Sequence, residues 1–83
     1  MNPKKGKQPD PNKSIFAKRM SDMRRAKGWT QWEFAEMLGS THMSIVYWET
    51  DRRRPRIDKL VEIVKLLGVS ADWLLGLDAE EEA

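Results

Sequence analysis

The chain has 83 residues with 40% apolar and 34% charged side chains and a net charge of +2, values typical of one small, soluble, globular domain. It has no cysteine and a single histidine, which excludes a disulfide framework and argues against a zinc site or a Cys/His nucleophile pair. No apolar run approaches the roughly 18 residues of a membrane span and no signal-peptide pattern is present, so we expect a cytoplasmic protein without membrane contact, metal or cofactor.

The charge is distributed unevenly along the chain. Residues 1–13 carry a net charge of +3, residues 77–83 carry −4, and the part between them carries +3. The central part contains a cluster of four arginines within five positions, namely Arg52, Arg53, Arg54 and Arg56. Such a cluster favours a polyanionic partner, with a solvated arginine loop as the alternative.

The two ends differ from the middle in composition. Residues 1–13 contain three prolines and no apolar residue after Met1, which predicts a disordered basic arm. Residues 77–83 are mostly acidic and predict a frayed tail. We therefore expect one folded domain over residues 14–76.

Apolar residues that repeat every three or four positions predict helices throughout this domain. In chain order we expect them over residues 15–26, 31–38, 42–50, 57–67 and 71–75. The residues expected to face the core are Phe16, Met20, Met23, Trp29, Phe34, Ala35, Leu38, Ile45, Trp48, Leu60, Val61, Val64, Leu67 and Trp73. No segment alternates with a period of two between turn signals. The fold class predicted is all-α, a bundle of five short helices.

Polar residues mark the starts of these helices. Thr30 and Glu33 form a capping box, in which a hydroxyl and a carboxylate three residues apart satisfy two free backbone amides. Thr41 and Ser70 can cap the third and fifth helices. Arg56 stands where the fourth helix would have its polar cap, so this start is poorly capped. The glycines suited to helix ends are Gly28, Gly39, Gly68 and Gly76.

The spacing between the second and third helices predicts a helix-turn-helix. Two helices that cross at roughly 90–120° need a turn of about 3–4 residues. Ala35 allows the third helix to approach closely, Gly39 permits the positive φ of the turn, and Ile45 fills the crossing point. This pattern alone also occurs by chance in other helical proteins.

A longer combination of residues makes the assignment specific. The segments are RRAKGWTQ at 24–31, FAEMLG at 34–39, SIVYWE at 44–49, RRRP at 52–55 and LGVS at 67–70. With them, residues 14–76 resemble the phage repressor/Cro (XRE-type) helix-turn-helix family. The resemblance implies a five-helix, lambda-repressor-like domain that binds double-stranded DNA, with its third helix in the major groove. It also implies a palindromic operator, a homodimer and a transcriptional regulator, with repression favoured over activation.

The resemblance assigns roles to individual positions. The residues that match the family's base-reading face are His42, Met43, Ser44 and Tyr47. Those that match or adjoin its phosphate contacts are Thr30, Gln31, Thr41, Thr50, Arg52, Arg53 and Arg54. Arg24 and Glu49 match a buried ion pair that ties the first helix to the end of the third.

The base-reading face departs from the family pattern, because no side chain there makes the bidentate contacts of arginine to guanine or glutamine to adenine. His42 and Ser44 can exchange hydrogen bonds with bases, whereas Met43 and Tyr47 suit thymine methyl groups. The alternative is that Met43 or Tyr47 packs into a neighbouring domain or a dimer surface. Trp32 is expected to be exposed, against a sugar–phosphate backbone, against a partner chain, or without a contact.

Two further questions concern partners. Trp73, Leu74 and Leu77 are candidates for a dimer patch, as well as for the core. An enzyme is not expected, because the sequence shows no nucleophile–base pair, metal cluster or phosphate-binding glycine loop. The rival function is a protein-interaction module, namely an antitoxin or an adaptor that uses the same fold to bind a toxin or another regulator.

Overall fold

The computed structural model describes residues 14–78, which form five helices and, within that range, no strand. The helices are α1 (Ile15–Ala26), α2 (Gln31–Leu38), α3 (His42–Glu49), α4 (Ile57–Leu67) and α5 (Ala71–Leu75). The all-α prediction is therefore confirmed. The expected basic arm over residues 1–13 lies outside the described residues, as do residues 79–83 of the expected frayed tail. The first two residues of that tail, Leu77 and Asp78, are helical instead. Across residues 14–78, no helix is long and apolar enough to cross a membrane.

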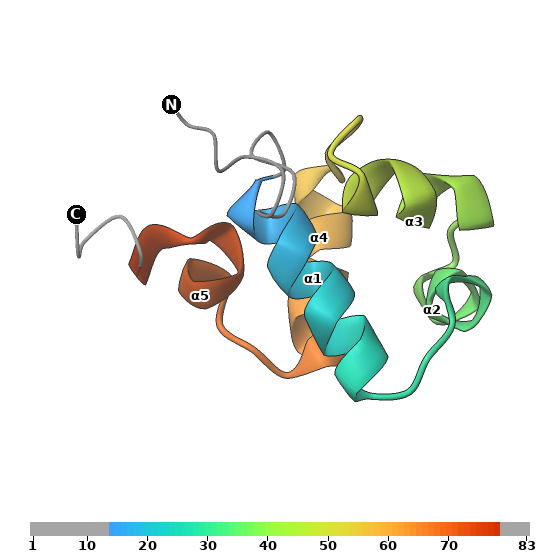
Figure 1. The fold of residues 1–83 in the computed structure, drawn as a ribbon, viewed down its shortest axis with the longest axis horizontal. Helices are drawn as coiled ribbons and strands as arrows, with labels where there is room; N and C mark the ends of the chain where they lie inside the picture. Colours follow the sequence, from blue (N-terminus) through green and yellow to red (C-terminus); the bar gives the residue numbers. More distant parts are fainter. Residues whose placement is uncertain (1–13, 79–83) are drawn as a thin grey trace, which may run out of the picture.

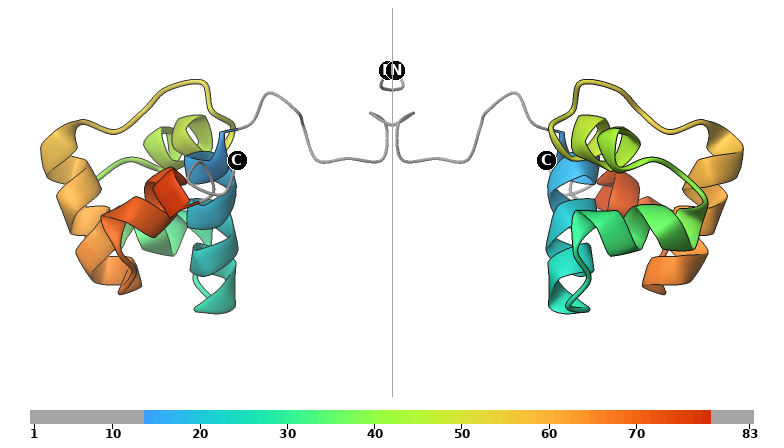
Figure 2. Two further views of the ribbon diagram at one scale, coloured as in Figure 1. Left: turned by 90° about the vertical axis from the view of Figure 1, so that its left-hand side faces the viewer. Right: turned by 90° about the vertical axis from the view of Figure 1, so that its right-hand side faces the viewer.

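The helices are arranged around α1, which packs against α3 and α5. Figure 1 shows α2 and α3 on one side of α1, and α5 on the other. This view looks along the axis of α2, whereas α3 lies across it; in the right-hand view of Figure 2 the two helices exchange these orientations. The steep crossing of α2 and α3 is the arrangement expected of a helix-turn-helix.

The core contains most of the apolar residues that the sequence predicts. Phe34, Met20 and Ile45 have no exposed surface, and Trp48 is 8% exposed. The prediction for α4 was wrong at one position, because Val61 is 46% exposed while Ile63 is fully buried. Ile63 and Leu67 are buried, and Leu60, Val64 and Leu66 pack against the core from partly buried positions. Val61 lies outside this core-facing side of α4.

The capping box at the start of α2 and the turn between α2 and α3 both form as the sequence predicts. The hydroxyl of Thr30 accepts a hydrogen bond from the amide of Glu33 at 3.0 Å, and the carboxylate of Glu33 accepts one from the amide of Thr30 at 2.8 Å. Gly39 then adopts φ +64°, a backbone conformation that other residues adopt with strain. The third helix ends at Glu49, one residue before the predicted end, because Thr50 caps it and Asp51 follows at φ +63°.

The C-terminal end of the fold is held against α1. Arg19 donates to the backbone oxygen of Trp73 and to Asp78, at 2.5 and 2.8 Å. A side chain on Gly76 would come within 2.9 Å of Ile15, so glycine allows close approach here. Leu74 has no exposed surface; its assignment to a dimer patch was wrong, because it fills the core.

Candidate nucleic-acid interface

The third helix has one buried and one accessible side. Ile45 and Trp48 seat it on the core, 0% and 8% exposed respectively. The four predicted base-reading residues all retain accessible surface: Met43 is 47% exposed, while His42, Ser44 and Tyr47 are half-buried. None of them is enclosed within the domain, so the predicted face of α3 is available to a partner.

The start of α3 is capped as expected. The hydroxyl of Thr41 accepts a hydrogen bond from the amide of Ser44 at 3.1 Å, and the two side-chain hydroxyls lie 3.0 Å apart in a second hydrogen bond. Both hydroxyls retain further hydrogen-bonding capacity toward an external group. At the other end of the helix, the hydroxyl of Thr50 donates to the backbone oxygen of Val46 at 2.7 Å.

The predicted ion pair between Arg24 and Glu49 is present and buried. Arg24 donates through Nε to Glu49 Oε2 at 2.6 Å and through Nη2 to Oε1 at 3.2 Å. Their side chains are only 8% and 5% exposed. Arg24 also donates to the backbone oxygen of Trp29 at 2.6 Å. The pair therefore links α1, the α1–α2 connection and the end of α3.

Gln31 extends this network toward the predicted base-reading face. Its Nε2 donates to Glu49 Oε1 at 3.0 Å, and its Oε1 lies 3.2 Å from His42 Nε2. The rings of Trp32 and His42 are stacked, with centroids 3.9 Å apart and planes within 6°. The sequence analysis missed both contacts of His42. The unusual exposed tryptophan beside Gln31 was the one signal for them.

The loop over residues 50–56, which we call the arginine loop, lies beside α3 (Figure 1). The guanidinium carbon of Arg53 is 5.0 Å from the centroid of the Tyr47 ring, a cation–π contact. Arg54 donates to Asp51 at 3.0 Å while its side chain remains 64% exposed. Arg52 is exposed and has no ion pair within residues 14–78. Thus two of the three arginines expected to contact phosphates, Arg53 and Arg54, already have side-chain contacts inside the domain.

The structure gathers only part of the predicted site around one hollow. A hollow of about 480 Å³ lies between α3, the arginine loop and the start of α4, lined in part by Thr41, Met43, Ser44, Tyr47 and Arg53. His42 lines a different hollow of about 420 Å³ together with Trp32 and Glu36. Thr30 and Thr50 are exposed outside both. The candidate interface therefore extends over the faces of α2 and α3 and the arginine loop.

Asp51 fixes the arginine loop to the start of α1. The hydrogen bond from Arg54 lowers the pKa of Asp51 below its ordinary value of 3.8, as do the contacts with Ser14, while burial opposes this shift. The amide of Ser14 donates to Asp51 Oδ2 at 3.1 Å. These contacts stabilise the ionised carboxylate in the folded state.

Asp51→Asn is expected to destabilise the domain at pH 7, because the hydrogen bonds to Arg54 and Ser14 lose their charge assistance. Asparagine tolerates the positive φ of this position, so the change tests the charge rather than the backbone. The folded-state pKa lies below the unfolded one, so this stabilisation is complete above the unfolded pKa and is lost as the pH falls through the folded value. Thermal unfolding measured from pH 7 down to pH 2 should show the melting temperatures of the wild-type protein and of Asp51→Asn converging as the pH falls. A constant difference would contradict this role.

Comparisons with known proteins agree with this geometry. A family model described as helix-turn-helix matches residues 20–74. The chain is 39% identical to the HTH-type transcriptional regulator ImmR of Bacillus subtilis (strain 168) over 63 residues, which cover 76% of this chain and 50% of ImmR. It is 33% identical to the uncharacterized HTH-type transcriptional regulator YobD of the same organism over 63 residues, 76% of this chain and 56% of YobD.

A similar solved structure is that of the P22 c2 repressor protein in complex with synthetic operator 9T. It matches with a TM-score of 0.69 and 27% identity, over 72% of this chain and 91% of that one. By contrast, the chain spans about half the length of the curated relatives ImmR and YobD. The matched relatives are named as HTH-type transcriptional regulators. The chain belongs to the XRE-type helix-turn-helix family of phage repressor and Cro proteins.

Proposed function

We propose that this domain is a DNA-binding transcriptional regulator, and that α3 reads base sequence in the major groove. The observation that carries the proposal is the seating of α3: Ile45 and Trp48 hold one side on the core, while Met43 and its neighbours leave the other side accessible. A single α-helix fits the major groove of B-DNA. The similar P22 c2 repressor was solved in complex with a synthetic operator, which supports this docking.

The phosphate contacts proposed here surround α3. Thr30 and Gln31 lie at the start of α2, where unpaired amides and the helix dipole favour an anion. The arginine loop supplies Arg52, Arg53 and Arg54 on the other side of the helix. Thr41 and Thr50, at the two ends of α3, complete the set. These residues position the protein on the duplex without reading sequence.

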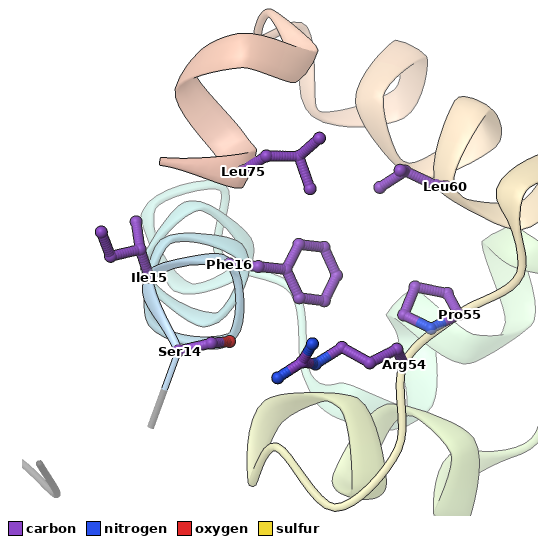
Figure 3. A pocket seen from close by; sticks show the side chains of 7 residues that line it. All are labelled: Ser14, Ile15, Phe16, Arg54, Pro55, Leu60 and Leu75. Atoms are coloured by element: carbon purple, nitrogen blue, oxygen red, sulfur yellow. The ribbon is translucent and has the colours of Figure 1, made fainter. Parts of the chain in front are cut away.

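We further propose that two copies bind a palindromic operator, and that the regulator acts as a repressor. Because Leu74 lies in the core, we place the proposed dimer surface on the exposed apolar side chains around α4 and α5. A hollow of about 300 Å³, lined mostly by apolar side chains, lies at this place. Figure 3 shows Phe16 pointing into it between Leu60 and Leu75. Nearby on α4, Ile57 is 75% exposed. A symmetric pair would place its two α3 helices about 34 Å apart, one turn of DNA.

Selection of bound sequences from a random duplex library tests this function. We expect the purified protein to enrich a palindromic consensus whose half-site centres are about one helical turn apart, 10–10.5 base pairs. Enrichment of a single, unrepeated site would refute the dimer while retaining sequence-specific binding. Absence of any consensus, with capture of a protein partner instead, would favour the antitoxin or adaptor function.

Thymine methyl groups are expected to contribute to recognition. Met43 is 47% exposed and Tyr47 is half-buried, and apolar side chains of this kind contact the thymine methyl in the major groove. Replacing thymine by uracil in the selected site removes the methyl group and keeps base pairing. We expect weaker binding in a titration followed by fluorescence anisotropy, and a smaller effect of the same replacement in the Met43→Ala variant. Equal affinity for the two duplexes would refute the contact.

A further inference from the structure

The stack between Trp32 and His42 joins the two helices of the helix-turn-helix at the edge of the proposed interface. Trp32 is the second residue of α2 and is 68% exposed, whereas His42 is the first residue of α3. Their rings lie 3.9 Å apart between centroids and within 6° of parallel. A flat contact of this kind restricts the imidazole to one plane, because rotation out of that plane breaks the stack. The indole therefore fixes the orientation of a predicted base-reading side chain.

The hydrogen bonds of Gln31 fix the proton on His42. Both carboxylate oxygens of Glu49 accept hydrogen bonds from Arg24, whose guanidinium only donates. The amide nitrogen of Gln31 must therefore face Glu49, which leaves the amide oxygen facing His42 Nε2 at 3.2 Å. That oxygen only accepts, so the hydrogen bond requires a proton on Nε2.

This assignment determines what His42 offers to a partner. In the neutral imidazole one nitrogen donates and the other accepts, so Nδ1 carries a free lone pair. Within residues 14–78, the imidazole ring of His42 has one hydrogen-bond partner, which is Gln31, and this bond is made through Nε2. The donors that the major groove presents to an acceptor are the exocyclic amines of adenine and cytosine.

We propose that Trp32 is a positioning residue that, together with Gln31, presents His42 Nδ1 as an acceptor for the exocyclic amine of adenine or cytosine. The inference rests on the proposed DNA-binding function and adds the base class that His42 reads. It also gives a role to the exposed side chain of Trp32, because packing of the core does not require a tryptophan at this position. Trp32 acts through His42 and need not touch a base itself.

The experiment compares selected binding sites among variants of the whole chain. The His42→Ala variant identifies the position that His42 reads, as the one whose preference it loses. At that position we expect wild-type protein to select adenine or cytosine, with a roughly five- to tenfold preference over guanine or thymine, the size of one hydrogen bond. Trp32→Leu should reduce the preference to less than about twofold, and Trp32→Phe, which retains a stacking ring, should restore it. Met37→Ala, on the same helix and 46% exposed, is the matched control and should select the wild-type site.

A second measurement reports the positioning without DNA. Nitrogen-15 chemical shifts of the His42 ring should show the proton on Nε2 in the wild-type protein, and a mixture of the two neutral forms in Trp32→Leu and in Gln31→Ala. Selection of guanine or thymine at the His42 position, or an unchanged preference in Trp32→Leu, overturns the inference while sequence-specific binding stands. Failure of the wild-type protein to enrich any sequence overturns the proposed function, and the inference with it.

Discussion

Glu49→Ala is expected to lower the free energy of unfolding by about 3–5 kcal/mol, because the variant leaves the guanidinium of Arg24 buried without its charged partner. The two side chains are 8% and 5% exposed, so water cannot replace the carboxylate without opening the α1–α3 contact. The same change also removes the acceptor of Gln31, which lies 3.0 Å away. Urea denaturation at pH 7 measures the effect. A domain this small has little stability to lose, so a variant that shows no cooperative unfolding transition, because it is already unfolded without urea, also agrees with the prediction.

Glu62→Ala is the matched control for this prediction. Glu62 pairs with Lys59 at 3.1 Å, but its side chain is 52% exposed, so its loss is expected to change the unfolding free energy by less than about 1 kcal/mol. The double variant Arg24→Met/Glu49→Leu removes both buried charges and should recover most of the stability. If Glu49→Ala unfolds at the same urea concentration as Glu62→Ala, the buried pair does not have the proposed role of fixing α3.

Replacing Arg52 and Arg53 by glutamine is expected to weaken the salt dependence of DNA binding. A dimer of this variant lacks four phosphate contacts, so the slope of log affinity against log salt should become shallower by about three to four units. Between 50 and 200 mM salt, the wild-type protein should therefore lose roughly a hundredfold more affinity than the variant. Anisotropy titrations of the selected duplex over this range measure both slopes.

Lys65→Gln is the control for a general effect of removing positive charge. Lys65 lies on α4 beside Met37, at the opposite end of α2 from Gln31, and should leave the slope unchanged. If the Arg52/Arg53 variant and Lys65→Gln both retain the wild-type slope, the arginine loop is solvated rather than bound to phosphates.

The sequence predicted the helices well because their signals are local. Caps such as Thr30 and turn glycines such as Gly39 act on backbone groups a few residues away, and both appear in the structure as expected. In α4 the apolar residues exceed what one side can bury, so spacing alone did not distinguish Val61 from Ile63. That choice depends on the neighbouring helices, which no local pattern encodes.

The side-chain contacts of the candidate site were less predictable. The Arg24–Glu49 pair was expected only through the family resemblance, and the structure contains it. The stack of Trp32 on His42 and the position of Arg53 over Tyr47 were not expected. Each joins side chains on different elements, and depends on rotamers that are set once the helices have packed. Sequence spacing could place these residues on one surface without showing which of them touch.

The accessible face of α3 is the central element of this account, and nuclear magnetic resonance tests it most directly. Titration of the selected duplex into nitrogen-15-labelled protein should shift the backbone amides of residues 41–47 and 52–54 most strongly, together with those at the start of α2. The amides in the second half of α4, on the side of Lys65, should change little. Large shifts there, with the amides of α3 unmoved, would contradict the docking of α3 against DNA.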